Sequence, residues 1–111
     1  VMIKGIEALS AECLMAAHKA DVLEDILQSL GTEWTDRFDY NLDRMLVHGH
    51  RRAAEMEEVC RTLEELNVAP TLSQGTAARQ YALGEIGSGQ APKGLVEKLN
   101  LIDLNAKEKS S

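Results

Sequence analysis

Two neighbouring arginines and an acid that follows them are the residues of this sequence best suited to binding an anion. Arg51 and Arg52 lie at the beginning of a predicted helix, where the helix dipole favours acidic side chains. Guanidinium groups in that place need a partner, and an anionic substrate gripped by a guanidinium fork is one candidate. Glu55 is the other candidate, because it lies four residues after Arg51 and can form a helical ion pair. From the spacing alone, the ion pair is the favoured interpretation.

A lysine near two acids is the second arrangement that could do chemistry. Lys4 shares a predicted helix with Glu7 and Glu12, and a lysine of lowered pKa beside an acid can transfer a proton at a carbinol. On spacing alone, however, we expect all three side chains on the solvated face of that helix.

The histidines raise the question of a metal site. His48 and His50 flank Gly49, and Cys60 or a carboxylate could add a further ligand. Catalytic zinc needs three protein ligands on a rigid frame, and Cys60 lies on the apolar stripe of the next predicted helix, away from the histidines. We therefore predict two partly exposed histidines at a helix junction and no metal.

The elements that must position these residues are all predicted to be helices. Helical spacing places Ile3, Ile6, Leu9 and Cys13 on the apolar face of a first helix over residues 2–20. A short helix follows over residues 22–30. We expect Asp21 and Thr32 to act as N-caps of helices. Gly31 and Asn67 are expected directly after helix ends.

The second half of the chain continues the helical pattern. A third helix begins at Thr32 and is lightly interrupted at Gly49, and a fourth carries the apolar stripe from Met56 to Leu66. Another helix starts between Pro70 and Thr76. Residues 84–89 are glycine-rich and form a flexible turn instead of a phosphate-binding loop, since no strand precedes them. The final helix begins at about Pro92 and ends near Asn105, beyond which the tail is expected to fray.

These elements predict an all-α protein, a compact bundle of five to six helices that forms one domain over residues 1–111. The formal net charge of −6 argues against nucleic acid and anionic membranes as partners. No apolar run approaches a membrane span, and no signal peptide is visible.

Cys13 and Cys60 are expected to be buried thiols of a reducing compartment, the cytoplasm. The opening at Val1, already in a helical pattern without a cap, suggests a piece of a longer polypeptide.

Several strings of the sequence resemble the C-terminal domain of 6-phosphogluconate-dehydrogenase-like oxidoreductases, which are related to the β-hydroxyacid dehydrogenases. The most specific are Lys-Gly-x-Glu-Ala-Leu at residues 4–9 and Arg-Arg-Ala-x-Glu-Met at residues 51–56. Weaker similarity is found at residues 66–70 and 76–79, so the resemblance extends from Lys4 to about Tyr81.

The resemblance implies a dehydrogenase that binds NAD or NADP in an N-terminal Rossmann domain, which is absent from this chain. This C-terminal domain would then close the cleft over a small anionic substrate, a hydroxy acid or a related compound, and form a homodimer. Hydride would pass between the substrate and the nicotinamide. The domain alone would bind no cofactor and have no activity.

The resemblance also assigns the site residues. The catalytic lysine of the family aligns roughly two turns before Lys4, upstream of this chain. Many relatives have Lys-Asp where this chain has Ala54 and Glu55. We infer that Glu55 keeps the acidic role and that Arg51 replaces the lysine, so that Arg51 grips the substrate. His50 and Lys4 are weaker candidates for the substrate site.

Two other functions fit the sequence. One is a non-catalytic helical interaction or dimerisation module that keeps the family fold. The other is a metal-binding helical module, which would bind a stoichiometric divalent ion.

Overall fold

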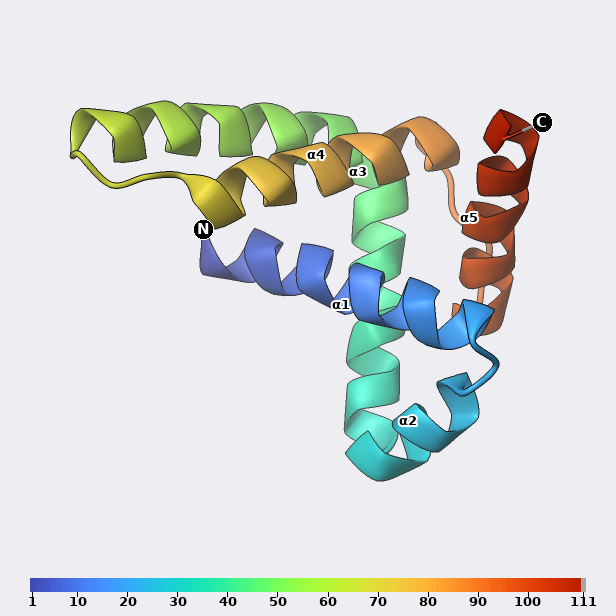
Figure 1. The fold of residues 1–111 in the computed structure, drawn as a ribbon. Coiled ribbons are helices and arrows are strands. Elements are labelled where there is room, and N and C mark those ends of the chain that lie inside the picture. Colours follow the sequence, from blue (N-terminus) through green and yellow to red (C-terminus); the bar gives the residue numbers. More distant parts are fainter. Residues whose placement is uncertain (111) are drawn as a thin grey trace.

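The chain folds into α-helices joined by short connections (Figure 1). The computed structural model describes the backbone of residues 1–110 and the side chains of residues 1–105. Within these residues there is no strand, and the prediction of an all-α bundle is confirmed. The helices are α1 (Met2–Lys19), α2 (Leu23–Leu30), α3 (Thr32–Glu65), α4 (Thr71–Gly87) and α5 (Leu95–Ser110).

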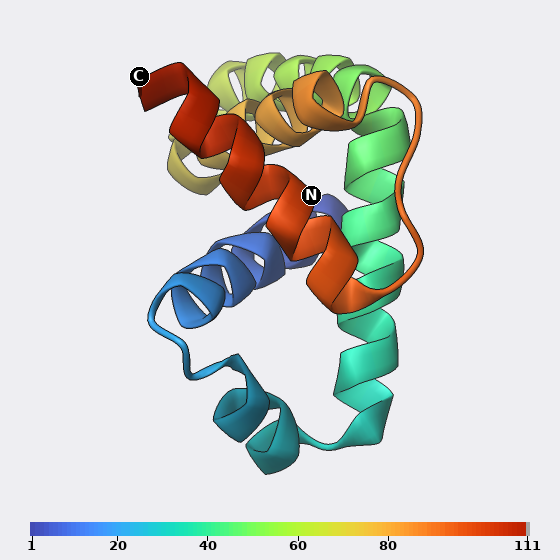
Figure 2. The same ribbon diagram turned by 90° about the vertical axis from the view of Figure 1, so that its right-hand side faces the viewer.

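Helix α3 is the element on which the others pack, and it bends sharply about halfway along (Figures 1 and 2). Its first arm rises from α2, and its second arm turns away and lies alongside α4. The two separate helices predicted for this stretch are therefore wrong, because α3 is one helix of 34 residues. The weak interruption expected at Gly49 did not end the helix, since this glycine remains within the helical backbone.

Glycines bring α3 and α4 into close contact. A Cβ on Gly49 would overlap the carbonyl oxygen of Gln80, and one on Gly87 would overlap the carbonyl oxygen of Leu46. A Cβ on Gly84 would lie 2.6 Å from the backbone nitrogen of His50. The flexible turn predicted over residues 84–89 is thus largely wrong, because α4 continues to Gly87 and uses its glycines for packing.

The core is aliphatic and lies where α1, α4 and α5 meet α3. Helix α1 contributes small residues and one leucine to it, whereas α3 supplies the larger side chains. The largest fully buried apolar side chains are Leu14, Leu42, Met45, Leu46, Met56, Leu83 and Leu99.

Helix α1 turns its large apolar residues outward, contrary to the prediction. Ile3 is 75% exposed and Leu9 is 68% exposed, and Cys13 is exposed while Cys60 is buried. The inward face of α1 instead carries Ala8 and other small residues, which let the helix lie close to its neighbours. The sequence pattern was ambiguous because α1 has apolar residues on two faces.

Helix ends follow the predictions in part. Gly31 ends α2 and Asn67 follows α3, both with positive φ, as predicted. Asp21 and Thr32 do not act as N-caps, because Val22 and Gly31 occupy those positions. Helix α5 begins at Leu95, after Pro92, and its backbone remains helical to Ser110, past the end predicted at Asn105. Ser111 lies outside the described residues.

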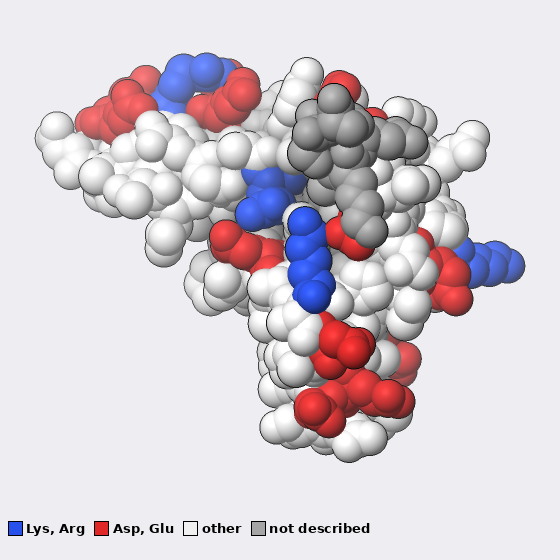
Figure 3. All heavy atoms as spheres, turned by 45° about the vertical axis from the view of Figure 1, so that its right-hand side comes forward, with Lys and Arg blue, Asp and Glu red and all other residues white. Residues whose placement is uncertain are grey.

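The surface is acidic at one end. Figure 3 shows Asp and Glu side chains gathered at the end of the molecule formed by α2, and Asp21, Glu24 and Asp25 are exposed in and before that helix. None of the helices in the described part of the chain is long and apolar enough to cross a membrane.

Replacing Gly49 or Gly84 with Ala tests the close contact of α3 and α4. Each added methyl group must push backbone away, so we expect the free energy of unfolding to fall by about 1–3 kcal/mol. Urea denaturation followed by circular dichroism measures the change. Gly75→Ala is the matched control in α4, since nothing lies within 4 Å of its added Cβ. That variant should be neutral or up to about 1 kcal/mol more stable; equal losses at Gly49 and Gly75 would contradict the packing described.

Candidate functional site

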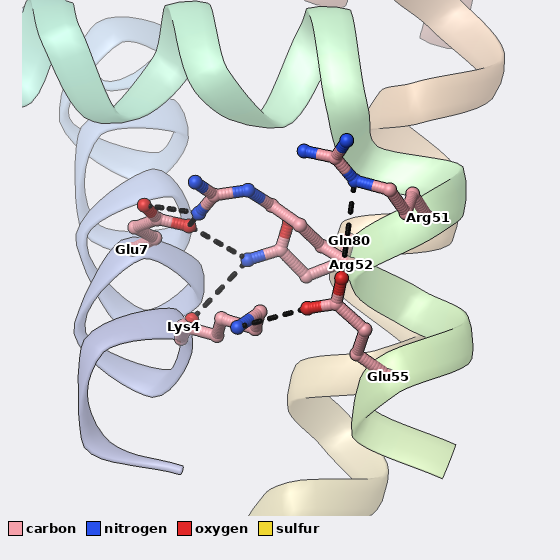
Figure 4. Close-up of polar contacts among 6 residues, drawn as sticks. All are labelled: Lys4, Glu7, Arg51, Arg52, Glu55 and Gln80. Atoms are coloured by element: carbon pink, nitrogen blue, oxygen red, sulfur yellow. Dashed lines mark hydrogen bonds and ion pairs between the residues drawn. The ribbon is translucent and has the colours of Figure 1, made fainter. Parts of the chain in front are cut away.

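A buried charged pair joins α1 to the bend of α3. Arg52 binds both carboxylate oxygens of Glu7 through its Nη1 atom. The Glu7 side chain is only 4% exposed and that of Arg52 15%. Gln80 of α4 completes the cluster, because its Nε2 donates to Oε1 of Glu7 at 3.0 Å and to the carbonyl oxygen of Lys4 at 3.3 Å (Figure 4).

This cluster has a structural role. Taking two charges out of water costs free energy, which their mutual attraction and the hydrogen bond from Gln80 offset. The pair ties the first turns of α1 to the second arm of α3, and Gln80 adds α4 to the same point. The Oε1 atom of Gln80 is buried and has no hydrogen-bond donor.

A second, more exposed chain of charges lies beside the first. Nζ of Lys4 is 3.1 Å from Glu55, and Glu55 is 3.8 Å from Nε of Arg51. The hydrogen bond from Lys4, followed by its charge, lowers the pKa of Glu55, and Arg51 and Arg52 add to the effect. The helical ion pair predicted between Arg51 and Glu55 is therefore present. It leaves the Arg51 side chain 66% exposed.

His50 does not join this group. Its Nε2 lies 2.8 Å from Glu85 of α4, and its ring is 4.8 Å from that of Tyr81. Of the four residues predicted for the substrate site, the structure thus brings together Lys4, Arg51 and Glu55 and turns His50 toward α4.

His48 lies next to several cationic side chains. Desolvation lowers its pKa, and the charges of Arg44, Arg51 and Arg52 lower it further, whereas Asp43 acts in the opposite direction. Both His48 and His50 are partly exposed, as predicted, but they lie within α3 and not at a helix junction. Among the residues whose side chains are described, no group of three His, Cys, Asp or Glu residues is placed to hold a metal ion.

Sequence reasoning missed the buried part of the site. Glu7 was expected on the solvated face of its helix, and this prediction is wrong. A signal was present, because Glu7 precedes Ala11 by four residues and Leu14 by seven, and so lies on the buried stripe of α1. The roles of Arg52 and Gln80 depend on the crossing of three helices, which no local pattern shows.

The side chains gathered at the bend of α3 are suited to binding a ligand. Arg51 presents an exposed guanidinium group whose Nε faces Glu55, so its terminal nitrogens are open to an acceptor. Lys4 is engaged by Glu55, and His50 by Glu85. The arrangement is suited to holding an oxyanion at the bend of α3.

Comparison with known proteins places the chain in a family. Residues 17–83 match the family described as "Domain of unknown function (DUF1932)", and the chain belongs to it. This family is a C-terminal helical domain associated with NAD(P)-binding dehydrogenases. No curated protein matches the chain.

A solved structure has a similar fold. It is the conserved hypothetical protein from Sinorhizobium meliloti 1021, with 32% identity and a TM-score of 0.76 over 91% of this chain. The chain spans only 36% of the length of that protein. Most of that protein therefore has no counterpart here.

The Arg52→Met variant tests the buried pair. It leaves the Glu7 carboxylate buried without a cation, so we expect a loss of about 3–5 kcal/mol of stability. The neighbouring Arg51→Met variant is the control and should change stability by no more than about 0.5 kcal/mol, because that side chain is exposed. Chemical denaturation measures both.

Adding Glu7→Gln to Arg52→Met separates the charge effect from lost packing. Gln removes the unpaired charge but still offers Gln80 an acceptor, so the double variant should recover at least part of the lost stability. A double variant no more stable than Arg52→Met would contradict this explanation.

Proposed function

We propose that this chain is the C-terminal domain of an NAD(P)-dependent dehydrogenase that acts on a hydroxy acid or a related anionic substrate. In this proposal the domain closes the substrate cleft and mediates dimerisation. The association of the family with NAD(P)-binding dehydrogenases supports the enzyme class. The length of the solved relative also supports it, since most of that protein has no counterpart here.

The observation that carries the proposal is the exposed guanidinium group of Arg51 at the bend of α3. Arg51 differs from the similarly exposed Arg37 and Arg61 in lying beside Lys4 and Glu55, where α1 meets the bend of α3. Glu55 lies 3.8 Å from the Nε of Arg51 and pairs with Lys4 at 3.1 Å, which leaves the terminal nitrogens of Arg51 open to a ligand. A guanidinium held in this way can bind a carboxylate or a phosphate with two hydrogen bonds.

The other predicted residues have supporting roles in this proposal. Glu55 orients Arg51, and Lys4 positions Glu55 and lowers its pKa, which keeps the carboxylate ionised. His50, fixed by Glu85, lines the neighbouring surface. NAD or NADP, when bound by the full-length protein, would provide the hydride-transfer chemistry. A separate N-terminal domain and an upstream lysine would provide the cofactor site and the catalytic base, so this domain alone would be inactive.

A second copy of the chain is the partner that we propose for the apolar face of α1 and α4. A groove of about 700 Å³ lies between these helices, and small residues such as Gly5, Gly75 and Ala78 line it. Leu9, which is 68% exposed, lines the same groove, and Ile3 of α1 is 75% exposed. Projecting side chains and a groove on one face are what a two-fold interface needs, because each copy supplies both. This face also supports the alternative function, a helical dimerisation module without catalysis.

Arg51→Ala in the full-length protein tests the substrate assignment. Loss of a charge-assisted pair should raise KM for the anionic substrate by about 10-fold or more. Steady-state kinetics of nicotinamide reduction against a panel of hydroxy acids measures it. Arg61→Ala is the control, since Arg61 is an exposed arginine of the same helix and pairs with Glu58. An unchanged KM for Arg51→Ala would remove this residue from the site.

Ile6→Glu tests the dimer, because Ile6 lines the groove and is 47% exposed. A charge there is tolerated by a monomer but costly in a buried interface, so sedimentation should show a dimer becoming a monomer. Val96→Glu is the control, with a valine that is also 47% exposed but lies on α5. A wild-type chain that sediments as a monomer at high concentration would refute the proposed interface.

A further inference from the structure

Gln80 is a fully buried polar residue of α4, and its side-chain amide is only half satisfied. Its Nε2 atom uses both of its hydrogens, donating to Oε1 of Glu7 at 3.0 Å and to the carbonyl oxygen of Lys4 at 3.3 Å. Its Oε1 atom, by contrast, finds no donor within the described part of the chain. A buried acceptor without a donor costs free energy, and an apolar side chain would avoid that cost. Packing alone therefore does not explain a glutamine at this position.

The hydrogen bond to Lys4 holds a part of α1 that has few other contacts. Among the described residues, no side chain caps the start of this helix. Val1, Met2 and Ile3 are 61%, 75% and 75% exposed, so the first turn buries little apolar surface. A helix end of this kind frays unless other contacts stabilise it. Gln80 supplies such a contact at the backbone of Lys4.

The position of Gln80 is fixed in turn by its contact with α3. Its backbone carbonyl oxygen lies so close to Gly49 that a Cβ on this glycine would overlap it. Helix α3 also carries Arg51 and Glu55, the exposed residues of the proposed anion site (Figure 4). Gln80 therefore sets the place of the first turn of α1 relative to these two residues.

The ion pair between Lys4 and Glu55 depends on that placement. Nζ of Lys4 lies 3.1 Å from Glu55, and the two side chains are 27% and 51% exposed. Exposed ion pairs are weak, partly because holding two side chains in one geometry costs entropy. A fixed backbone at Lys4 removes part of that cost. Glu55, engaged by Lys4, lies 3.8 Å from Nε of Arg51.

We propose that Gln80 is a positioning residue of the anion site, because its amide holds the first turn of α1 where Lys4 meets Glu55 beside Arg51. The inference rests on the proposed function, and it adds a residue that touches no ligand. The unsatisfied Oε1 atom follows from this role, since the amide nitrogen must point toward α1.

A double-mutant cycle on the 111-residue chain tests this order of contacts. NMR of the carboxylate carbon follows the pKa of Glu55, which the hydrogen bond and the charge of Lys4 lower in the wild-type chain. Gln80→Met removes the amide and should raise this pKa, because Lys4 is then less well held. Lys4→Met removes the ammonium group itself and should raise the pKa at least as much. In the Lys4→Met background, Gln80→Met should add no further rise, since Gln80 acts on Glu55 through Lys4.

Controls separate positioning from a loss of stability. Gln74→Met replaces an exposed glutamine of the same helix and should leave the pKa of Glu55 unchanged. Circular dichroism checks that each variant is folded. If Gln80→Met does not fold, Gln80→Asn takes its place, because it keeps an amide that is one methylene too short to reach both partners. It should move the pKa of Glu55 in the same direction.

Kinetics of the full-length protein provide the second readout. Gln80→Met should raise KM for the anionic substrate by about threefold and leave kcat unchanged. A residue that only stabilises the fold would instead lower the amount of active enzyme, and so the apparent kcat, without changing KM.

An unchanged pKa of Glu55 in Gln80→Met, or a full further rise when this change is added to Lys4→Met, overturns the inference. Either result leaves the proposed function to its own test, the KM of Arg51→Ala. If KM rises for Arg51→Ala but not for Gln80→Met, the inference fails and the proposed function stands. If neither KM rises, the substrate role of Arg51 is contradicted, and the inference fails with it even where the pKa cycle holds.

Discussion

The close contact between the backbones of α3 and α4 is the constraint on which the arrangement of this domain depends. Gly49 lets the carbonyl of Gln80 approach α3, and Gly84 and Gly87 let α4 lie against the same stretch. Any side chain there would push the helices apart. The contact holds Gln80 in place where it reaches Glu7, and it fixes the part of α3 that carries Arg51 and Arg52. Packing of small residues thus determines where the charges lie.

The two adjacent arginines of α3 have different surroundings. Arg52 points inward, pairs with Glu7 and joins α1 to α3. Arg51, one residue earlier on the helix, remains exposed, and its Nε lies 3.8 Å from Glu55. Two adjacent arginines of the bent helix are therefore in different environments, one buried in an ion pair and one largely exposed. Helix α1 shows a similar division, with small residues facing the core and large apolar residues facing out.

Much of the fold could be predicted from the sequence, because helical spacing and helix-ending residues are local signals. Gly31 and Asn67 mark the ends of helices, and the pair of Arg51 with Glu55 follows from spacing alone. The errors arose where tertiary contacts decide the outcome. Glycines that would weaken an isolated helix instead serve a close packing contact at residues 49 and 84.

The charged site was predictable only in its exposed half. Lys4, Arg51 and Glu55 were predicted to lie together and do so, but Glu7 was expected in solvent and is buried. Two features at helical spacing overlap on α1, one of large apolar residues and one of small ones, and periodicity could not choose between them. The side that faces the core carries Glu7, which pairs with Arg52, and small residues that fit beside α3 and α4.

The most direct test is a crystal structure of the full-length protein with NADP and an unreactive anionic analogue of the substrate. The account predicts that the anionic group of the analogue lies between the nicotinamide and the bend of α3, within hydrogen-bond distance of the terminal nitrogens of Arg51. An analogue bound at the nicotinamide without any contact to this domain would contradict the account, and the domain would then be a dimerisation module alone.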